Sequence, residues 1–196
     1  MTNKQALADY IQRIIPLSEE EVLDFISCFK PFKAKRRQFL VQPGFVAHHR
    51  YFVLKGALRA YVIGDQGQEH TIQLAIEDWW ISDYNSYMNQ LPATMFVMAM
   101  EDCELLQISH EDEKRLKAAS HHFETFFRML AERSAAYMQR RIITSLTQSA
   151  EERYEDFLTR YPLLNARMPQ YVIASYLGMS TEFLSKIRNN KLGRKS

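Results

Sequence analysis

Hydrophobic positions near the start of the chain follow the period of an α-helix. The spacing predicts helices over residues 4–15 and 18–29. Ser18 and Glu21 have the spacing of a capping box, which satisfies free backbone N–H groups at a helix start. The apolar positions that we expect to face inward in the second helix are Val22, Leu23, Phe25, Ile26 and Phe29. The chain therefore begins with a pair of short helices.

From residue 32 to residue 108 the apolar residues instead form short runs separated by turns that contain Gly or Pro. These runs predict strands at 32–36, 38–41, 51–54, 57–63, 69–76, 94–100 and 103–108, with a short helix at 83–89. Many short strands at such spacing are typical of an antiparallel sandwich or jelly roll. We therefore predict an antiparallel β-roll.

Helical spacing returns after Ser109, which is expected to cap a short helix. Residues 121–147 contain neither Pro nor Gly and predict one long helix. A stripe of residues three or four positions apart follows this helix: Phe127, Ala131, Ala135, Met138 and Ile142. Such spacing approaches that of a coiled-coil seam. The stripe could pack on the chain's own roll, but we favour a homodimer seam because the helix is long for a single domain.

The C-terminal part predicts a capped helix at 149–160 and then two short helices within 168–188. Gly178 can adopt the left-handed conformation that ends the first, and Ser180 can cap the second. The expected buried positions are Val172, Ile173, Ala174 and Leu177, followed by Phe183, Leu184 and Ile187. Two helices joined by a glycine turn form a helix-turn-helix, whose second helix enters the major groove of DNA.

The second of these helices has a polar and basic face. The candidate DNA-contacting residues are Ser180, Thr181, Glu182, Ser185, Lys186, Arg188 and Lys191. Residues 162–196 contain six Lys or Arg and one Glu, whereas residues 1–161 contain nineteen Lys or Arg and twenty-two Asp or Glu. A basic terminus suits binding to phosphates. An ordinary helical hairpin at a domain edge is the alternative interpretation.

Bulk composition narrows the class of protein. With 196 residues and 46% hydrophobic residues, the chain can bury a core. No apolar run approaches the roughly 20 residues that span a bilayer, and the start has no apolar signal segment, so secretion is not expected. Cys28 and Cys103 are too few for a Cys-rich zinc site or an iron–sulfur cluster. We expect a cytoplasmic protein without a membrane partner.

The order of these parts resembles the Crp/Fnr family of bacterial transcription regulators. The segment Tyr51-Phe-Val-Leu-Lys-Gly-Ala-Leu-Arg-Ala-Tyr61 is similar to a strand pair of that family. The resemblance implies an α+β chain with a cyclic-nucleotide-binding-like β-roll sensor at 1–120, a dimerisation helix at 121–147 and a DNA-binding domain at 148–196. It also implies three partners: double-stranded DNA, a second copy of the chain and RNA polymerase.

In the recognition helix of the family, a Glu and a basic residue four positions later read bases. Glu182 and Lys186 match those places. A carboxylate can accept a hydrogen bond from cytosine and a cation can donate to guanine. The β-hairpin wing that follows in the family is shortened here to 189–196, so we expect Lys191, Arg194 and Lys195 to contact phosphates instead.

The effector site departs from the family pattern. Members that bind cyclic AMP carry Gly-Glu and, about ten residues later, Arg-Ser, which hold the ribose and the phosphate. Here Ile81-Ser82 and Ala93-Thr94 fall at those places. Without the Arg the phosphate loses a bidentate partner, so cyclic AMP is not expected. The candidate effector-pocket residues are Trp79, Trp80, Ser82, Tyr84, Thr94 and Phe96. They suit an unknown apolar or aromatic effector, or they simply fill the core.

Two other functions compete with DNA binding. A cupin-like small-molecule or metal enzyme would draw ligands from His48, His49, His70 and Glu69, but these lack the spacing of a cupin metal site. A cyclic-nucleotide-binding module without DNA function would lack its phosphate-binding residues and leave the basic helix-turn-helix unexplained. We therefore expect no enzyme activity, and we assign no catalytic residue, metal ligand or resident cofactor.

Overall fold

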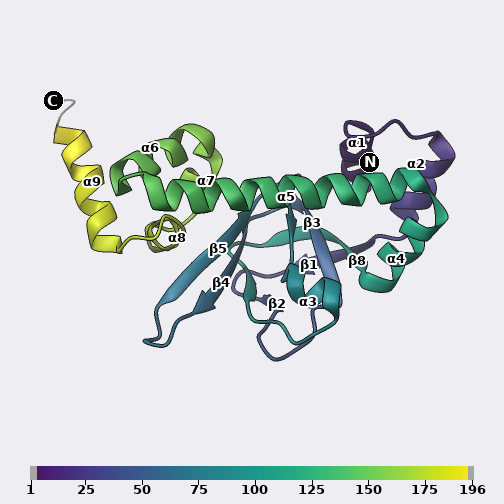
Figure 1. Ribbon diagram of the computed structural model, residues 1–196, viewed down its shortest axis with the longest axis horizontal. Coiled ribbons are helices and arrows are strands. Elements are labelled where there is room, and N and C mark those ends of the chain that lie inside the picture. The colour runs from purple at the N-terminus through teal and green to yellow at the C-terminus, as the bar shows by residue number, and fades with distance from the viewer. Residues whose placement is uncertain (1–3, 194–196) are drawn as a thin grey trace. The chain divides into compact units, whose positions relative to one another are not determined.

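The computed structural model describes residues 4–193. The strands are β1 (Lys30–Ala34), β2 (Phe39–Val41), β3 (His49–Lys55), β4 (Leu58–Ile63), β5 (Glu69–Ala75), β6 (Trp80–Ile81), β7 (Phe96–Ala99) and β8 (Cys103–Ser109). The helices are α1 (Gln5–Gln12), α2 (Glu19–Ser27), α3 (Tyr84–Asn89), α4 (His110–Ala119), α5 (His121–Thr147), α6 (Ala150–Arg160), α7 (Pro162–Arg167), α8 (Gln170–Tyr176) and α9 (Thr181–Gly193). The predicted α+β class is confirmed (Figure 1).

The strands form two four-stranded sheets within the described part of the chain, in the orders β1-β8-β3-β6 and β2-β7-β4-β5. The pairs β1–β8, β3–β8, β3–β6 and β2–β7 are antiparallel. The predicted antiparallel roll is therefore confirmed. The predicted run at 32–36 corresponds to β1, which begins two residues earlier, at Lys30. Strand β6 was not predicted, because it has only two residues and shows no clear alternation of apolar and polar positions.

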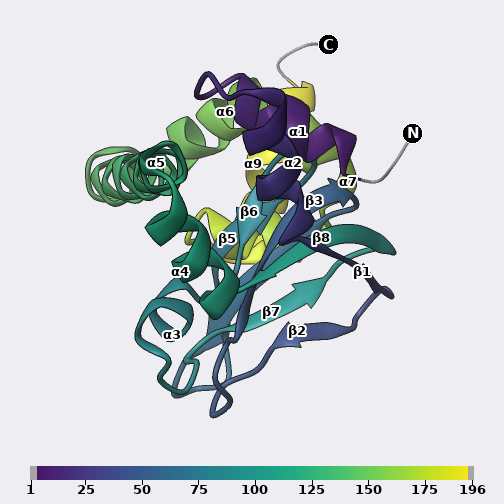
Figure 2. The ribbon, with the colours of Figure 1, turned by 90° about the vertical axis from the view of Figure 1, so that its right-hand side faces the viewer.

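Alternation along β3 divides its side chains between two hydrophobic cores. Tyr51 and Val53 join the core between the two sheets, whereas Phe52 points to the outer face. There it meets a cluster of aromatic side chains from α2 and the first turns of α5, including Phe25 and Phe126. Figure 2 shows α1 and α2 over the sheet of β3 and β8, on the side away from β2 and β7.

The chain divides into two compact units. The first, which we call the roll unit, contains the residues up to Ala60 together with Gln73–Ala135. The second, which we call the C-terminal unit, contains Tyr61–Ile72 together with the residues from Ala136 onward. Both strands of the β4–β5 hairpin and helix α5 pass from one unit into the other. The domain boundaries expected at 120 and 147 remain a prediction.

Local signals account for most helix starts. Ser18 with Glu21 and Ser149 with Glu152 form the capping boxes of α2 and α6. Ser109 accepts a hydrogen bond from the backbone N–H of Asp112 at the start of α4. Helix α5 covers His121–Thr147, as predicted.

Helix α7 was not predicted. The Tyr161-Pro162 pair indicates the end of α6, but Pro162 also lies at the first position of a new helix, where its missing N–H costs nothing. Among residues 4–193, no helix combines the length and apolar character needed to cross a membrane.

Candidate functional site

Helices α8 and α9 form the predicted helix-turn-helix. Gly178 between them has a φ of 68°, in the left-handed region that favours glycine. The Ser180 hydroxyl accepts a hydrogen bond from the backbone N–H of Phe183 at 3.1 Å and caps α9. The two helices are held by a shared apolar core, in which Val172, Ile173, Ala174, Leu177, Leu184 and Ile187 are buried.

The outward face of α9 contains the charged candidate residues. Glu182, Lys186 and Arg188 are exposed, and Glu182 and Lys186 are one helical turn apart on the same face. A hydrogen bond from its own backbone N–H, and then one from the Ser180 hydroxyl, lower the pKa of the Glu182 carboxyl. The carboxylate is therefore an acceptor positioned at the start of the helix.

Three other candidates on α9 differ in accessibility. Thr181 is half-buried, and Ser185 is half-buried with its hydroxyl engaged: it accepts from Gln170 Nε2 at 2.6 Å and donates to the Thr181 carbonyl at 3.0 Å. The side chain of Lys191 and the residues Arg194 and Lys195 lie outside the described part.

One expected core position of α9 is wrong. Phe183 is 45% exposed rather than buried, because the apolar face of this helix is narrower than the sequence pattern indicates. Leu184 and Ile187 alone fill the space against α8.

Helix α5 changes character along its length. Phe127 is 2% exposed and packs on Phe25 and Phe126 in the roll unit, so the expected seam loses its first residue. Ala131 is half-buried and Ala135 is exposed. The later part exposes large apolar side chains: Met138 (36%), Ile142 (60%), Ile143 (53%) and Leu146 (79%). An apolar stripe of this kind is typical of a surface that another chain covers.

The six candidate effector-pocket residues do not gather around one cavity. Trp79, directly before β6, packs against the core between the sheets, while Trp80 in β6 packs against Phe29 and Phe52 on the outer face, because successive residues of extended backbone point to opposite sides. The Phe96 ring packs on Phe39 with ring centres 5.5 Å apart.

The polar members of this candidate set line neither the cavity beside α5 described below nor the one beside β2. Tyr84 and Thr94 are exposed, and the Ser82 hydroxyl donates to the His49 carbonyl at 2.8 Å. The sequence could not show which of these side chains face inward.

A buried carboxylate binds the segment where the family pattern places the phosphate-binding pair. Asp83 is 1% exposed and caps α3 by accepting from the backbone N–H of Ser86 at 3.1 Å. Its other oxygen accepts from the N–H groups of Thr94 at 2.8 Å and Met95 at 3.1 Å. Two backbone donors that could bind an anion therefore already hold a negative charge of the chain itself. An Asp directly before a short predicted helix was the available signal.

Among residues 4–193, no group of three or more His, Cys, Asp or Glu side chains could hold a metal ion. His48 Nδ1 lies 3.2 Å from Gln90 Oε1, and burial lowers the pKa of His49. Both cysteines are buried thiols.

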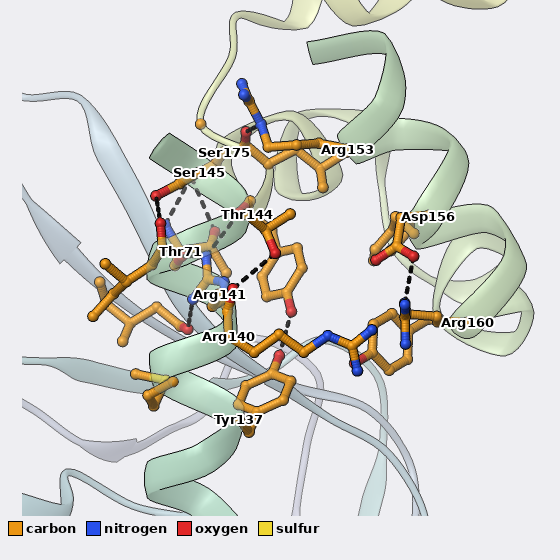
Figure 3. A pocket seen from close by; sticks show the side chains of 18 of the residues that line it. Thr71, Tyr137, Arg140, Arg141, Thr144, Ser145, Arg153, Asp156, Arg160 and Ser175 are labelled. Carbon is orange, nitrogen blue, oxygen red and sulfur yellow. Dashed lines mark hydrogen bonds and ion pairs between the residues drawn. The ribbon is translucent and has the colours of Figure 1, made fainter. Parts of the chain in front are cut away.

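A cavity of about 410 Å³ lies within the C-terminal unit (Figure 3). Its walls are α5, α6, α8 and residues 70–72 of β5. Arg141 joins these elements: its guanidinium donates to the carbonyls of Thr71, Ile72 and Tyr176 and lies 4.0 Å from the centre of the Tyr176 ring. The Ser175 hydroxyl accepts from the Thr71 N–H at 2.8 Å. This cavity was not predicted from the sequence, although the several arginines of α5 and α6 indicate a cationic surface there.

The chain was compared with protein families and with solved structures. The family model of the cyclic nucleotide-binding domain matches residues 31–120. Solved structures superpose on most of the chain, with TM-scores of 0.72 and 0.73. The chain has the Crp/Fnr fold. The resemblance inferred from the sequence is thereby confirmed at the level of the fold.

The chain is similar to three solved Crp/Fnr-type structures. A putative Crp/Fnr regulator from Eubacterium rectale has a TM-score of 0.73 at 17% identity and covers 94% of this chain and 88% of its own. FixK2 from Bradyrhizobium japonicum has a TM-score of 0.73 at 14% identity, covering 85% and 86%. The c-di-GMP-responsive regulator CLP from Xanthomonas campestris has a TM-score of 0.72 at 14% identity, covering 91% and 93%. A search of curated proteins finds no match.

Proposed function

We propose that this protein is a transcription regulator of Crp/Fnr type that binds a pseudo-palindromic DNA site as a homodimer. The observation that carries the proposal is the capped helix α9, which exposes Glu182, Lys186 and Arg188 after a left-handed glycine turn. The basic balance of residues 162–196 supports binding to phosphates. Double-stranded DNA is thus the proposed ligand, and RNA polymerase is a further proposed partner.

Glu182 and Lys186 are the proposed base readers. Their spacing of one helical turn lets both enter one major groove, where the carboxylate accepts from cytosine N4 and the ammonium group donates to guanine O6 or N7. Arg188, Ser180 and Thr181 are proposed to contact the backbone or neighbouring bases. Ser185 has a lesser role in this scheme, because Gln170 and Thr181 already hold its hydroxyl.

Selection of bound duplexes from a random DNA pool tests this function. We expect an inverted-repeat consensus with half-sites about one helical turn apart. On the selected site, Lys186→Ala should weaken binding by about 1–3 kcal/mol while leaving binding to random DNA nearly unchanged. Lys114→Ala is the matched control, because it removes an exposed lysine from α4 in the roll unit. Equal losses of Lys186→Ala on both kinds of DNA would refute base reading.

The exposed stripe Ala135, Met138, Ile142 and Leu146 of α5 is the proposed dimer seam. These residues lie on one side of the helix at spacings of three and four. A carboxylate placed in an apolar seam is costly to desolvate. Ile142→Glu should therefore convert the dimer to monomer in gel filtration with light scattering. Ala136→Glu adds the same charge to another side of the helix and should leave the dimer intact; a wild-type monomer would contradict the proposal.

We further propose that the roll does not use cyclic AMP as its effector. The Asp83 carboxylate already accepts from the N–H groups of Thr94 and Met95, and its negative charge would repel a phosphate placed there. The solved structures with this fold that are named above are regulators, and we propose no enzyme activity for this chain.

Regulation would then act through the segments that the two units share. Hairpin β4–β5 and helix α5 are continuous with the roll, while Thr71 and Arg141 contact α8 in the C-terminal unit. A change in the roll that moves these segments would alter the position of the helix-turn-helix.

A further inference from the structure

The cavity of the C-terminal unit has the size of a small-molecule site. Its volume of about 410 Å³ falls within the range of roughly 300–1,000 Å³ that is common for ligand pockets. All its lining residues belong to the C-terminal unit. It is distinct from the predicted effector pocket, whose six residues do not line it.

The lining is strongly cationic. It includes four arginines, at positions 140, 141, 153 and 160, but only one carboxylate, that of Asp156. Arg160 Nε donates to Asp156 at 2.5 Å, so the charges of these two side chains offset each other. Arg141 and Arg153 donate to backbone carbonyls, which satisfy their N–H groups without neutralising their charge.

Arg140 is the available cation of this cavity. It is exposed, and in the described part of the chain its guanidinium has neither a hydrogen-bond partner nor an ion-pair partner, while its backbone carbonyl accepts from the Thr144 hydroxyl. Figure 3 shows its side chain extending from α5 toward that of Arg160 on α6. Two guanidinium groups that extend toward each other in a wall with a single carboxylate favour a bound anion, because it would offset their mutual repulsion.

Aromatic rings form much of the remaining wall. Tyr137, Phe157, Tyr161 and Tyr176 line the cavity, and the ring centres of Phe157 and Tyr176 are 5.7 Å apart. The hydroxyl groups of Tyr137 and Tyr176 form a hydrogen bond with each other. Burial raises the pKa of Tyr161 and Tyr176, so both stay uncharged hydroxyl groups at neutral pH. Such a wall packs well against a flat apolar ring.

We propose that this cavity binds a small aromatic anion, with a phosphate or carboxylate group at Arg140 and Arg160 and its ring against Tyr161 and Phe157. An inorganic anion alone would leave most of the volume unfilled. A neutral aromatic compound would leave the arginine charges without a counter-charge. The inference concerns a ligand site and does not depend on whether the protein binds DNA. Met138 and Ile142 of the proposed dimer seam also line the cavity, so a partner chain would cover this part of its wall.

Isothermal titration calorimetry on the full chain tests the site with four probes: phenyl phosphate, phenylacetate, benzyl alcohol and inorganic phosphate. Phenyl phosphate or phenylacetate should bind more tightly than the other two, and the tighter of these anions identifies the preferred acidic group. Arg140→Gln should weaken that binding by about tenfold, the effect of one charge-assisted hydrogen bond. Arg188→Gln is the matched control, since Arg188 is also an exposed arginine of the C-terminal unit but does not line the cavity.

Several outcomes would overturn the proposal. Absence of binding by both aromatic anions rejects the site, as does equal affinity for benzyl alcohol or for inorganic phosphate alone. Equal weakening by Arg140→Gln and Arg188→Gln would show general charge attraction instead of a site. Thermal unfolding of each variant checks that its fold is intact. The Arg140 side chain is exposed and has no hydrogen-bond or ion-pair partner in the described part of the chain. We therefore expect Arg140→Gln to leave the unfolding temperature unchanged.

Discussion

Replacing Asp83 by Ala tests whether its carboxylate holds the loop between α3 and β7. The variant loses the cap of α3, which is worth about 1 kcal/mol. It also leaves the N–H groups of Thr94 and Met95 without their acceptor. Each such loss costs about 1 kcal/mol where water has partial access. We therefore expect the free energy of unfolding to fall by about 3 kcal/mol, a large part of the total stability of a typical domain.

Urea unfolding followed by tryptophan fluorescence measures this loss of stability in the roll unit, which contains Asp83. Both tryptophans, Trp79 and Trp80, belong to the roll unit. With a urea dependence of roughly 2–3 kcal/mol per molar, the midpoint should fall by roughly 1 M. Asp65→Ala removes an exposed carboxylate from the β4–β5 turn and should leave the midpoint unchanged. Asp83→Asn should lose less stability than Asp83→Ala, because its amide oxygen can still accept at one of the two places while its NH2 group faces backbone donors at the other.

Two results would refute this role of Asp83. The first is an Asp83→Ala midpoint equal to that of Asp65→Ala, which would mean that the carboxylate does not satisfy the loop. The second is a measurement with inorganic phosphate at constant ionic strength. If the Thr94 and Met95 N–H groups can bind an anion once the carboxylate is removed, phosphate should stabilise Asp83→Ala more than the wild type. Equal effects of phosphate on both proteins would remove the anion-site interpretation.

Two further substitutions test the roll. Gly56 has a φ of 117°, and a Cβ there would lie 2.5 Å from Cys103 Sγ, so Gly56→Ala should cost about 3 kcal/mol in urea unfolding. Gly44→Ala, at a φ of 86° with nothing within 4 Å of the added carbon, should cost only about 1 kcal/mol; equal losses would contradict the role of the close contact. Glu113→Gln should cost about 3–5 kcal/mol, because it leaves the buried Arg50 guanidinium, now 3.3 Å from the carboxylate, without its counter-charge. An unchanged melting temperature would show that the pair contributes no net stability.

Local sequence signals predicted most of the secondary structure because their causes are local. The capping box of Ser18, the long uninterrupted helix 121–147 and the glycine turn at Gly178 each depend on residues within a few positions of one another. The strands with clear alternation were also found. Strand β6 and helix α7 were missed. The two residues of β6 gain their conformation from pairing with β3, which lies far away in the sequence.

The DNA-contacting face of α9 and the expected effector pocket differ in the same way, since the first depends on local periodicity and the second on distant parts of the chain. The polar face of α9 follows directly from helical periodicity, so Glu182 and Lys186 could be placed on it from the sequence. The expected effector pocket could not be judged in this way. Whether Trp79 and Trp80 share a cavity depends on the directions of their side chains at the start of the two-residue strand β6, and they point to opposite faces.

By itself, then, the sequence determined the order of elements, the roll and the helix-turn-helix, because periodicity, capping residues and glycine conformation act over a few residues. Tertiary structure alone decided which distant groups meet. It brought the Asp83 carboxylate to the N–H groups of Thr94 and Met95, buried Phe127 in the roll unit, and placed Arg140 and Arg160 at one cavity with residues of β5. Such meetings depend on the packing of whole elements, which no local pattern specifies.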